Sequence, residues 1–357
     1  MMTNTTRPTS NHNNSFGAIR YILAWIVFTA HFNILSGAEI PLPITTPYAL
    51  KGFFAISGFL LFSTLENRPR TTFSFLWERF LRLIPVYWAV VIHGALGLAF
   101  FSTMSVADYF LSPQWWKYLF SNILTLNFLE PELPGVFQDG TFHTVNGSLW
   151  YVKAELAVTF YTAVVFALTH SRGIRLRVSV IVSAITFAIV LALTIWYPEM
   201  GIMQKATYFL SLWLSFIIGS VIYYILPSLM RHPKLMGAAC VVIFAEILIM
   251  KNWTSNYDPF QSLAVALLVI VAGNVPTKWG KWLSNHTDLS YTFFLCHFPI
   301  VQLVIRTPQI VAAGMTVAYF TSLFLTLAIS FLLTFTVENQ CKKIIAKSRK
   351  NYAAGKQ

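Results

Sequence analysis

Charged residues are scarce in this chain. They make up 11% of its 357 residues, against about a quarter in an ordinary soluble domain, while 56% are hydrophobic. This composition excludes a water-soluble globular domain. Cysteine is also rare, and Cys240, Cys296 and Cys341 have neither the spacing of a disulfide framework nor that of a metal site. We therefore expect packing cysteines and no bound metal.

We expect no cleavable secretory signal at the amino terminus. Residues 1–15 are polar and rich in Asn and Thr, without the basic stretch, apolar run and small-residue cleavage site of such a signal. No low-complexity linker or internal repeat divides the rest. We predict a disordered cytoplasmic tail over 1–15, a transmembrane domain over 16–340 and a basic cytoplasmic tail over 341–357.

Long apolar runs dominate what is present. A bilayer core about 30 Å thick needs about 20 apolar residues per helix. Ten segments qualify and predict an all-α polytopic membrane protein with the lipid bilayer as partner: 17–36, 47–65, 82–102, 148–168, 178–196, 206–226, 235–250, 260–275, 289–307 and 313–337. The segment 115–129 is shorter and contains Asn122 and Asn127, so we interpret it as interfacial or re-entrant.

The distribution of charge sets the orientation. The net charge of +12 would suggest nucleic acid in a soluble protein, but here the basic residues follow the membrane sides. With ten spans and a cytoplasmic amino terminus, most Lys and Arg residues fall on the inner side, as the positive-inside rule requires. The long third connection is acidic and has Lys117 as its only basic residue. We predict cytoplasmic termini and no nucleic-acid partner.

Two ionisable residues share one face of the first predicted helix. Arg20 and His31 are eleven residues apart, which corresponds to about 20° around a helix and about 16 Å along it. An imidazole at membrane depth is a functional hypothesis by default. The alternatives are an interfacial anchor for Arg20 and a structural hydrogen bond for His31.

Two arginines stand at the inner start of the third predicted helix. Arg79 and Arg82 are three residues apart, so they are neighbours on a helix surface, and guanidinium groups suit phosphates. The alternatives are that they only set the topology, or that Glu78 pairs with Arg82.

Five short motifs, in order, resemble those of the membrane-bound acyltransferase family 3. They are Arg20 with His31; Phe53-Phe54-Ala55-Ile56-Ser57-Gly58-Phe59-Leu60; Arg79-Phe80-Leu81-Arg82; Gly147-Ser148-Leu149-Trp150-Tyr151-Val152-Lys153-Ala154-Glu155-Leu156; and Ser290-Tyr291-Thr292-Phe293-Phe294-Leu295-Cys296-His297-Phe298-Pro299. The resemblance covers almost the whole chain. Where the family usually has Ser-Val-Glu-Glu, this chain has Val152-Lys153-Ala154-Glu155, with one acidic residue fewer and an added lysine.

The resemblance implies an activity. Members of the family transfer acyl groups, commonly acetyl from cytoplasmic acetyl-CoA, to hydroxyls of extracytoplasmic glycans. We therefore expect an O-acetyltransferase of the bacterial cytoplasmic (inner) membrane, with acyl-CoA and a glycan as substrates. We expect the form without an appended SGNH domain, acting alone or with a partner protein.

The same resemblance suggests roles for the motif residues. We expect His31 to be the general base, Glu155 to orient its imidazole, and Arg20, Arg79 and Arg82 to hold the coenzyme phosphates. The alternative for Glu155 is an ion pair with Lys153 or another cation. Weaker candidates for substrate contacts are Ser57, Ser148, Trp150, Tyr291 and His297, although Ser57 next to Gly58 favours helix packing and His297 equally fits a structural hydrogen bond.

A secondary transporter is the main alternative, because buried His, Glu and Arg residues also line transport pathways. That function predicts inverted repeats with paired broken helices, and the sequence shows no such pairing.

Overall fold

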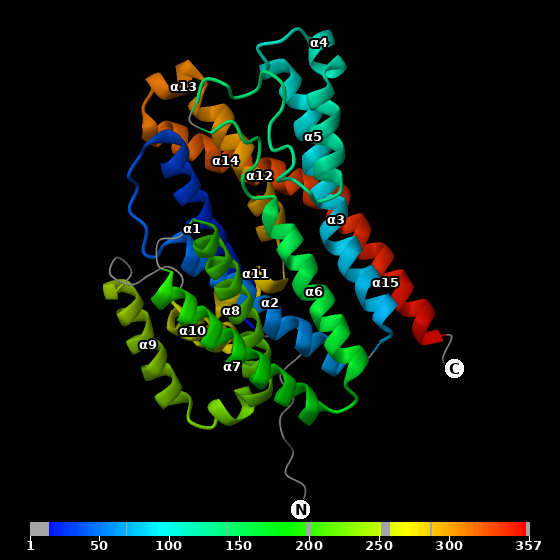
Figure 1. Cartoon of the computed structure of the whole chain (residues 1–357), viewed down its shortest axis with the longest axis vertical. Helices are drawn as coiled ribbons and strands as arrows, with labels where there is room; N and C mark the ends of the chain where they lie inside the picture. The colour runs from blue at the N-terminus through cyan, green and yellow to red at the C-terminus, as the bar shows by residue number, and fades with distance from the viewer. Residues whose placement is uncertain are drawn as a thin grey trace, which may run out of the picture. The chain divides into compact units, whose positions relative to one another are not determined.

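The computed structural model describes residues 14–68, 70–140, 142–197, 201–250, 258–285 and 288–354. These residues form helices and connecting loops without a strand, which confirms the predicted all-α class (Figure 1). Residues 1–13 of the predicted amino-terminal tail and residues 355–357 of the predicted carboxy-terminal tail lie outside the described residues.

The helices follow the predicted apolar segments. The elements are α1 (Phe16–Ser36), α2 (Thr46–Asn67), α3 (Thr72–Gly97), η1 (Leu98–Phe101), α4 (Val106–Leu111), α5 (Pro113–Ile123), α6 (Trp150–Leu168), α7 (Arg172–Trp196), α8 (Gly201–Leu229), α9 (Pro233–Met250), α10 (Pro259–Asn274), α11 (Lys278–Asn285), α12 (Ser290–Ile305), α13 (Pro308–Ala312), α14 (Met315–Leu333), η2 (Thr334–Glu338) and α15 (Asn339–Ala354). Each of the ten segments overlaps a helix of this series, and the segments 82–102 and 313–337 extend into η1 and η2.

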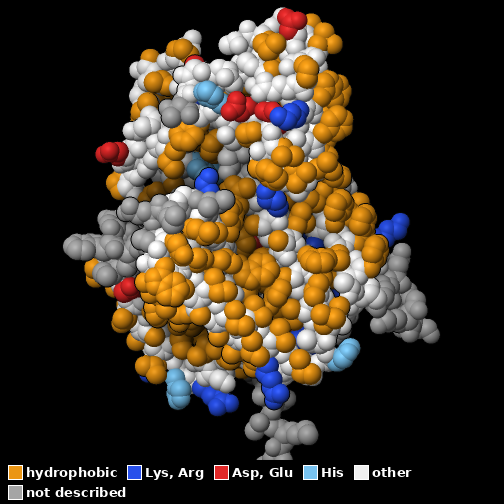
Figure 2. Space-filling view, viewed as in Figure 1, with side chains coloured by type: hydrophobic (Ala, Val, Ile, Leu, Met, Phe, Trp, Pro, Cys, Tyr) orange, Lys and Arg blue, Asp and Glu red, His pale blue; other side chains and the backbone are white. Residues whose placement is uncertain are grey.

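Length and hydropathy identify the protein as a multi-pass membrane protein. Among the described residues, seven helices are long and apolar enough to cross a bilayer: Phe16–Ser36, Thr46–Asn67, Thr72–Phe101, Trp150–Leu168, Arg172–Trp196, Met203–Leu229 and Met315–Arg349. The helices α10 and α12 are apolar but shorter. Hydrophobic side chains are far more abundant than charged ones on the face in Figure 2, as expected for a lipid-facing surface. The count of ten spans and the cytoplasmic termini stay predictions.

Two segments show where hydropathy is a poor guide to helix boundaries. The third predicted span starts at residue 82, whereas α3 begins at Thr72, so Arg79 and Arg82 lie inside the helix and not at its start. Charged residues interrupt an apolar run without interrupting a helix, because helical hydrogen bonds are made by the backbone. The segment 115–129 overlaps α5, whose 11 residues extend only about 16 Å and cannot cross the bilayer core alone.

The chain forms two compact units, and the first comprises residues 1–27, 41–72 and 158–288. In this unit α2 packs against α8 and α10, and α7 packs against α8. Glycines allow the close approach of α2 and α8, since a Cβ on Gly58 would overlap the carbonyl oxygen of Phe216 and one on Gly219 would overlap that of Ala55. Small residues commonly give such contacts between membrane helices.

The second unit comprises residues 28–40, 73–157 and 289–357. In this unit α12 packs against α14, which continues through the π-helical turn η2 into α15. The second half of α3 is joined to α5 by two hydrogen bonds, from Tyr87 to the Asn122 carbonyl and from Trp88 to the Ile123 carbonyl. The side chains considered below as a candidate active site belong to this second unit.

Candidate active site

Two histidines from different helices form a hydrogen-bonded pair. His31, near the end of α1, places Nδ1 2.7 Å from Nε2 of His297 on α12. The two rings are nearly parallel, with centroids 5.0 Å apart and an interplanar angle of 14°. His297 is fully buried and His31 is half-buried. The pair therefore combines an accessible imidazole with a buried partner that fixes its orientation.

The buried histidine has a second polar neighbour. Oγ of Ser148, in the loop before α6, lies 3.4 Å from His297 Nε2, and Ser148 is itself 1% exposed. At the other ring nitrogen, Nδ1, no hydrogen-bond partner is found within the described part of the chain. Aromatic rings enclose the pair, including Phe298, whose edge meets the His31 ring at 5.1 Å, and Phe28.

A buried ion pair forms a second cluster. Arg79 on α3 donates from Nη2 to Glu155 Oε2 on α6 at 3.1 Å, and the side chains are 14% and 4% exposed. The Tyr151 hydroxyl, one turn before Glu155 on α6, donates to the other carboxylate oxygen at 2.7 Å. Arg79 Nε is buried and has no hydrogen-bond partner among the described residues. The arginine thus keeps a buried N–H group that can bind an added acceptor.

One phenylalanine contacts both clusters. The centroid of the Phe294 ring on α12 lies 4.9 Å from that of Tyr151 and 5.8 Å from that of His297. The histidine pair and the arginine–glutamate pair are therefore neighbours, separated by an apolar ring.

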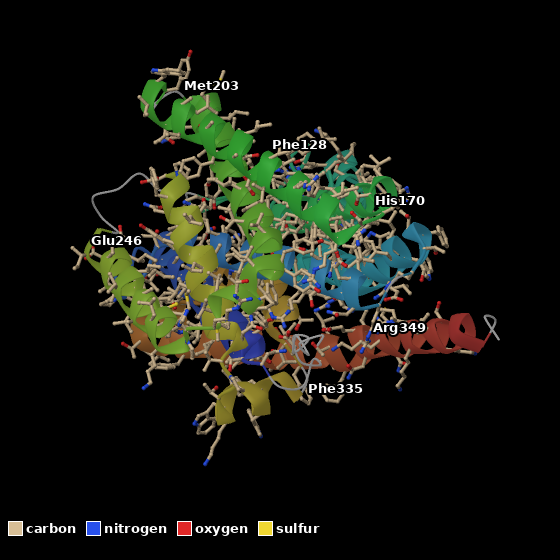
Figure 3. The ribbon with its side chains drawn as sticks, turned by 90° about the horizontal axis from the view of Figure 1, so that it is seen from below. Phe128, His170, Met203, Glu246, Phe335 and Arg349 are labelled. Carbon is tan, nitrogen blue, oxygen red and sulfur yellow. The ribbon has the colours of Figure 1, made fainter. Side chains whose placement is uncertain are left out.

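The carboxy-terminal helix contacts α3 beside the ion pair. Arg349, labelled in Figure 3, lies on α15. It donates from both Nε and Nη2 to Oε2 of the buried Glu78. Arg82, one turn further along α3, is exposed. The predicted alternative of a Glu78–Arg82 ion pair is therefore replaced by a Glu78–Arg349 pair, which leaves the Arg82 guanidinium at the surface.

Comparison with known protein families identifies the family of this chain. Residues 13–335 match the model of the acyltransferase domain of acyltransferase family 3. The chain belongs to acyltransferase family 3. This match covers nearly the whole chain and confirms the resemblance seen in the motifs. A search of curated proteins and a search of solved structures find no match.

Family membership makes this protein a membrane acyltransferase, which needs an acyl donor and an acceptor. Among the described residues, no group of three or more His, Cys, Asp or Glu is arranged to hold a metal ion. The arrangement of His31, His297 and Ser148 suits proton transfer, and that of Arg79 and Arg82 suits binding of an anion.

The structure gives His31 a different partner from the one expected for this acyltransferase. The sequence pointed to Glu155 as the residue that orients His31, but the His31 ring is hydrogen-bonded to His297, whereas Glu155 binds Arg79 and Tyr151. The alternative of an ion pair between Glu155 and a cation is correct in kind, although the cation is Arg79 and not Lys153. Electrostatic attraction weakens with distance, so the Glu155 carboxylate interacts more strongly with the adjacent Arg79 guanidinium than with a more distant imidazole.

The other candidate residues are more scattered. Arg20 lies in the first unit, where it forms a 3.4 Å ion pair with Asp288, and Ser57 lies in the same unit beside the closely packed Gly58. In the second unit the Tyr291 hydroxyl donates to the Leu83 carbonyl on α3 at 2.7 Å. Trp150, half-buried at the start of α6, meets Tyr151 edge to face.

Sequence reasoning assigned no role to Tyr151 or Asn146. Tyr151 stands four residues before Glu155, a spacing that places the two side chains on one helix face and could have suggested their hydrogen bond. Asn146 stands two residues before Ser148, and its contacts could not be inferred because they are made with α12.

Proposed function

We propose that this family 3 acyltransferase transfers an acetyl group from cytoplasmic acetyl-CoA to a hydroxyl of an extracytoplasmic glycan, with His31 as the general base. The observation that supports this assignment is the 2.7 Å contact between His31 Nδ1 and His297 Nε2. A buried partner on one ring nitrogen directs the other nitrogen of the half-buried imidazole toward a substrate. The family supplies the acyl-transfer chemistry.

The reaction balances without any further reagent. The acceptor hydroxyl oxygen attacks the thioester carbonyl carbon, so that a C–O bond forms and the C–S bond breaks. His31 Nε2 takes the hydroxyl proton and passes it to the leaving coenzyme A sulfur. For Nε2 to accept a proton, His31 Nδ1 must carry a hydrogen and donate it to His297 Nε2. His297 therefore acts as a positioning residue.

The arginines of α3 suit the donor. Coenzyme A carries a pyrophosphate and a ribose phosphate, and guanidinium groups bind phosphates through paired N–H donors. We assign to this role Arg82, which is exposed, and Arg79, whose buried Nε has no hydrogen-bond partner in the described part of the chain. Glu155 then acts as the positioning residue for Arg79. A contribution from Arg20 stays a prediction from the sequence.

The acceptor side is defined by residues around Ser148. Ser148 Oγ lies beside the histidine pair, and Trp150 two residues later has a partly exposed ring of the kind that stacks on sugars. We propose that the enzyme lies in the bacterial cytoplasmic membrane, with the acyl donor on the cytoplasmic side and the glycan on the opposite side.

The test uses membranes that contain the full-length protein, incubated with labelled acetyl-CoA and candidate surface glycans. We expect the wild type to form labelled glycan ester and His31→Ala to be slower by about 10²–10⁴-fold, the usual contribution of a general base. His93→Ala is a matched control, because His93 is an exposed histidine on α3 bonded to its own helix at the Ala89 carbonyl.

Two outcomes would overturn the proposal. Transfer at the wild-type rate by His31→Ala would remove His31 as the base. Accumulation of an unmodified solute in proteoliposomes, with no ester formed from labelled acetyl-CoA, would instead favour a transporter.

A further inference from the structure

A proline in α12 leaves one backbone carbonyl without its helical donor. Pro299 has no amide hydrogen, so the carbonyl of Leu295, four residues earlier, cannot form its normal helical hydrogen bond. Leu295 is fully buried, and an unpaired carbonyl is expensive in a membrane interior. The side-chain amide of Asn146 fills this position, with Nδ2 donating to the Leu295 oxygen at 2.7 Å.

The same side chain also shapes the loop that carries Ser148. Asn146 Oδ1 accepts a hydrogen bond from the Ser148 backbone N–H at 3.0 Å. Between them, Gly147 packs against Phe298, and a Cβ at this position would come within 2.7 Å of that ring. Asn146 therefore joins the loop to α12 at the helical turn that carries the buried histidine.

A second bond fixes the loop further along α12. Gln302 donates to the Thr144 carbonyl at 2.7 Å. The two anchor points on α12, Leu295 and Gln302, lie on either side of His297 in sequence. The loop is thus held in register with the histidine, and Ser148 Oγ lies 3.4 Å from His297 Nε2 as a result.

We propose that Asn146 is a positioning residue of the acyl-transfer site, holding Ser148 and His297 in the register that the His31–His297 pair requires. This inference rests on the proposed function. Asparagine suits the task because its amide offers a donor for the Leu295 carbonyl and an acceptor for the Ser148 N–H. Alanine offers neither. A serine at position 146 could still accept the hydrogen bond from the Ser148 N–H, but its side chain is too short to reach the Leu295 carbonyl on α12.

The experiment separates the two bonds of Asn146. We compare Asn146→Ala, Asn146→Ser and the double variant Asn146→Ala/Pro299→Ala with their parents, measuring kcat, the KM for acetyl-CoA and thermal stability. Asn122→Ala is the matched control, since Asn122 is also a buried asparagine that donates to backbone carbonyls, those of Tyr118 and Glu130.

We expect Asn146→Ala to lower kcat on the order of tenfold to a hundredfold with a nearly unchanged KM, because small displacements of reacting groups have effects of this size. Asn146→Ser should recover part of the kcat. In the Pro299→Ala background the new amide can serve the Leu295 carbonyl, so Asn146→Ala should no longer lower stability but should still lower kcat. Asn122→Ala should lower stability with an unchanged kcat for the folded protein.

Two results would overturn the inference. Equal kcat values for Asn146→Ser and Asn146→Ala would show that the Ser148 bond has no effect. If Asn146→Ala no longer lowered kcat in the Pro299→Ala background, the only function of Asn146 would be to donate a hydrogen bond to the Leu295 carbonyl. Either result, obtained with an active wild type, leaves the proposed function intact, whereas a wild type that transfers no acetyl group to glycan rejects the proposed function itself.

Discussion

The same three residue types form a buried trio in each unit, and the two trios differ in how the arginine is bonded. The first unit has Glu66, Arg175 and Tyr224, and the second has Glu155, Arg79 and Tyr151. Arg175 donates to both Glu66 oxygens, at 2.7 and 3.3 Å, and to the Thr169 carbonyl at 2.9 Å. Arg79 makes one bond to Glu155, and its Nε lacks a partner among the described residues.

The difference distinguishes an arginine used for structure from one that can bind a ligand. Exposure does not explain it, since the side chains of Arg175 and Arg79 are 13% and 14% exposed. A buried N–H group without an acceptor is unfavourable. The Arg79 Nε, which has no acceptor among the described residues, is consistent with the anion site proposed above. We therefore expect the trio of the first unit only to stabilise the fold, and the trio of the second unit also to bind the acyl donor.

The largest effect should come from removing either carboxylate. Glu66→Gln and Glu155→Gln each leave a mostly buried guanidinium without its counter-charge, and we expect each to lower the free energy of unfolding by about 3 kcal/mol. Denaturation of the purified variants in detergent measures this loss. Only Glu155→Gln should also change the KM for acetyl-CoA, and an equal change in both variants would contradict the comparison.

Replacing the arginines by lysine should separate the two trios by function. Lysine keeps the charge but loses the planar fork, so we expect Arg79→Lys to raise the KM for acetyl-CoA by about 30-fold, equivalent to about 2 kcal/mol of donor binding. Arg175→Lys should lower stability and leave this KM within about twofold. Initial rates at varied acetyl-CoA concentration provide the measurement. An unchanged KM in Arg79→Lys would remove Arg79 from the donor site.

The tyrosines should behave alike in the two units. Each hydroxyl donates to its glutamate at 2.7 Å, so Tyr151→Phe and Tyr224→Phe each lose one hydrogen bond to a charged acceptor. We expect both to lower the free energy of unfolding by about 1.5 kcal/mol. Thermal unfolding of the two variants checks this, and a difference above about 1 kcal/mol between them would show that the trios differ in more than the arginine.

The helices were predictable because lipid imposes apolar runs of a set length. The start of α3 was not, since Glu78 and Arg79 lower the local hydropathy while their side chains are paired with Arg349 and Glu155. A hydropathy value reflects the free energy of transferring one residue type to lipid. It takes no account of an ion pair that neutralises the charge through a residue far away in the sequence.

The sequence pointed to candidate site residues but not to how they pair. The motifs identified His31, His297, Arg79 and Glu155, but the histidines are 266 residues apart and the ion pair 76 residues apart. Which imidazole meets which partner depends on how the helices pack, and helical periodicity within one segment carries no information about that packing. The contacts of Asn146 were equally hidden, because one of them is made with a carbonyl that Pro299 leaves unpaired on α12.

An arginine–carboxylate pair whose carboxylate is exposed to solvent should give the smallest effect. The hydrogen bond from Arg306 holds the pKa of Asp139 below its ordinary value, and the Asp139 side chain is 71% exposed. A carboxyl whose pKa is lowered by folding contributes stability above its unfolded pKa and loses that contribution as the pH falls through the folded value. At pH 7 we therefore expect Asp139→Asn to destabilise the protein by less than about 1 kcal/mol.

The difference in stability between Asp139→Asn and the wild type should vanish in acid, where the carboxyl is protonated. It should also vanish in high salt, which screens exposed charges far more than buried ones. Unfolding measured against pH and ionic strength tests both. If salt weakened the Glu66 and Glu155 pairs as much as the Asp139 pair, solvent would reach all three, and the argument from a buried, unpartnered Arg79 nitrogen would fail.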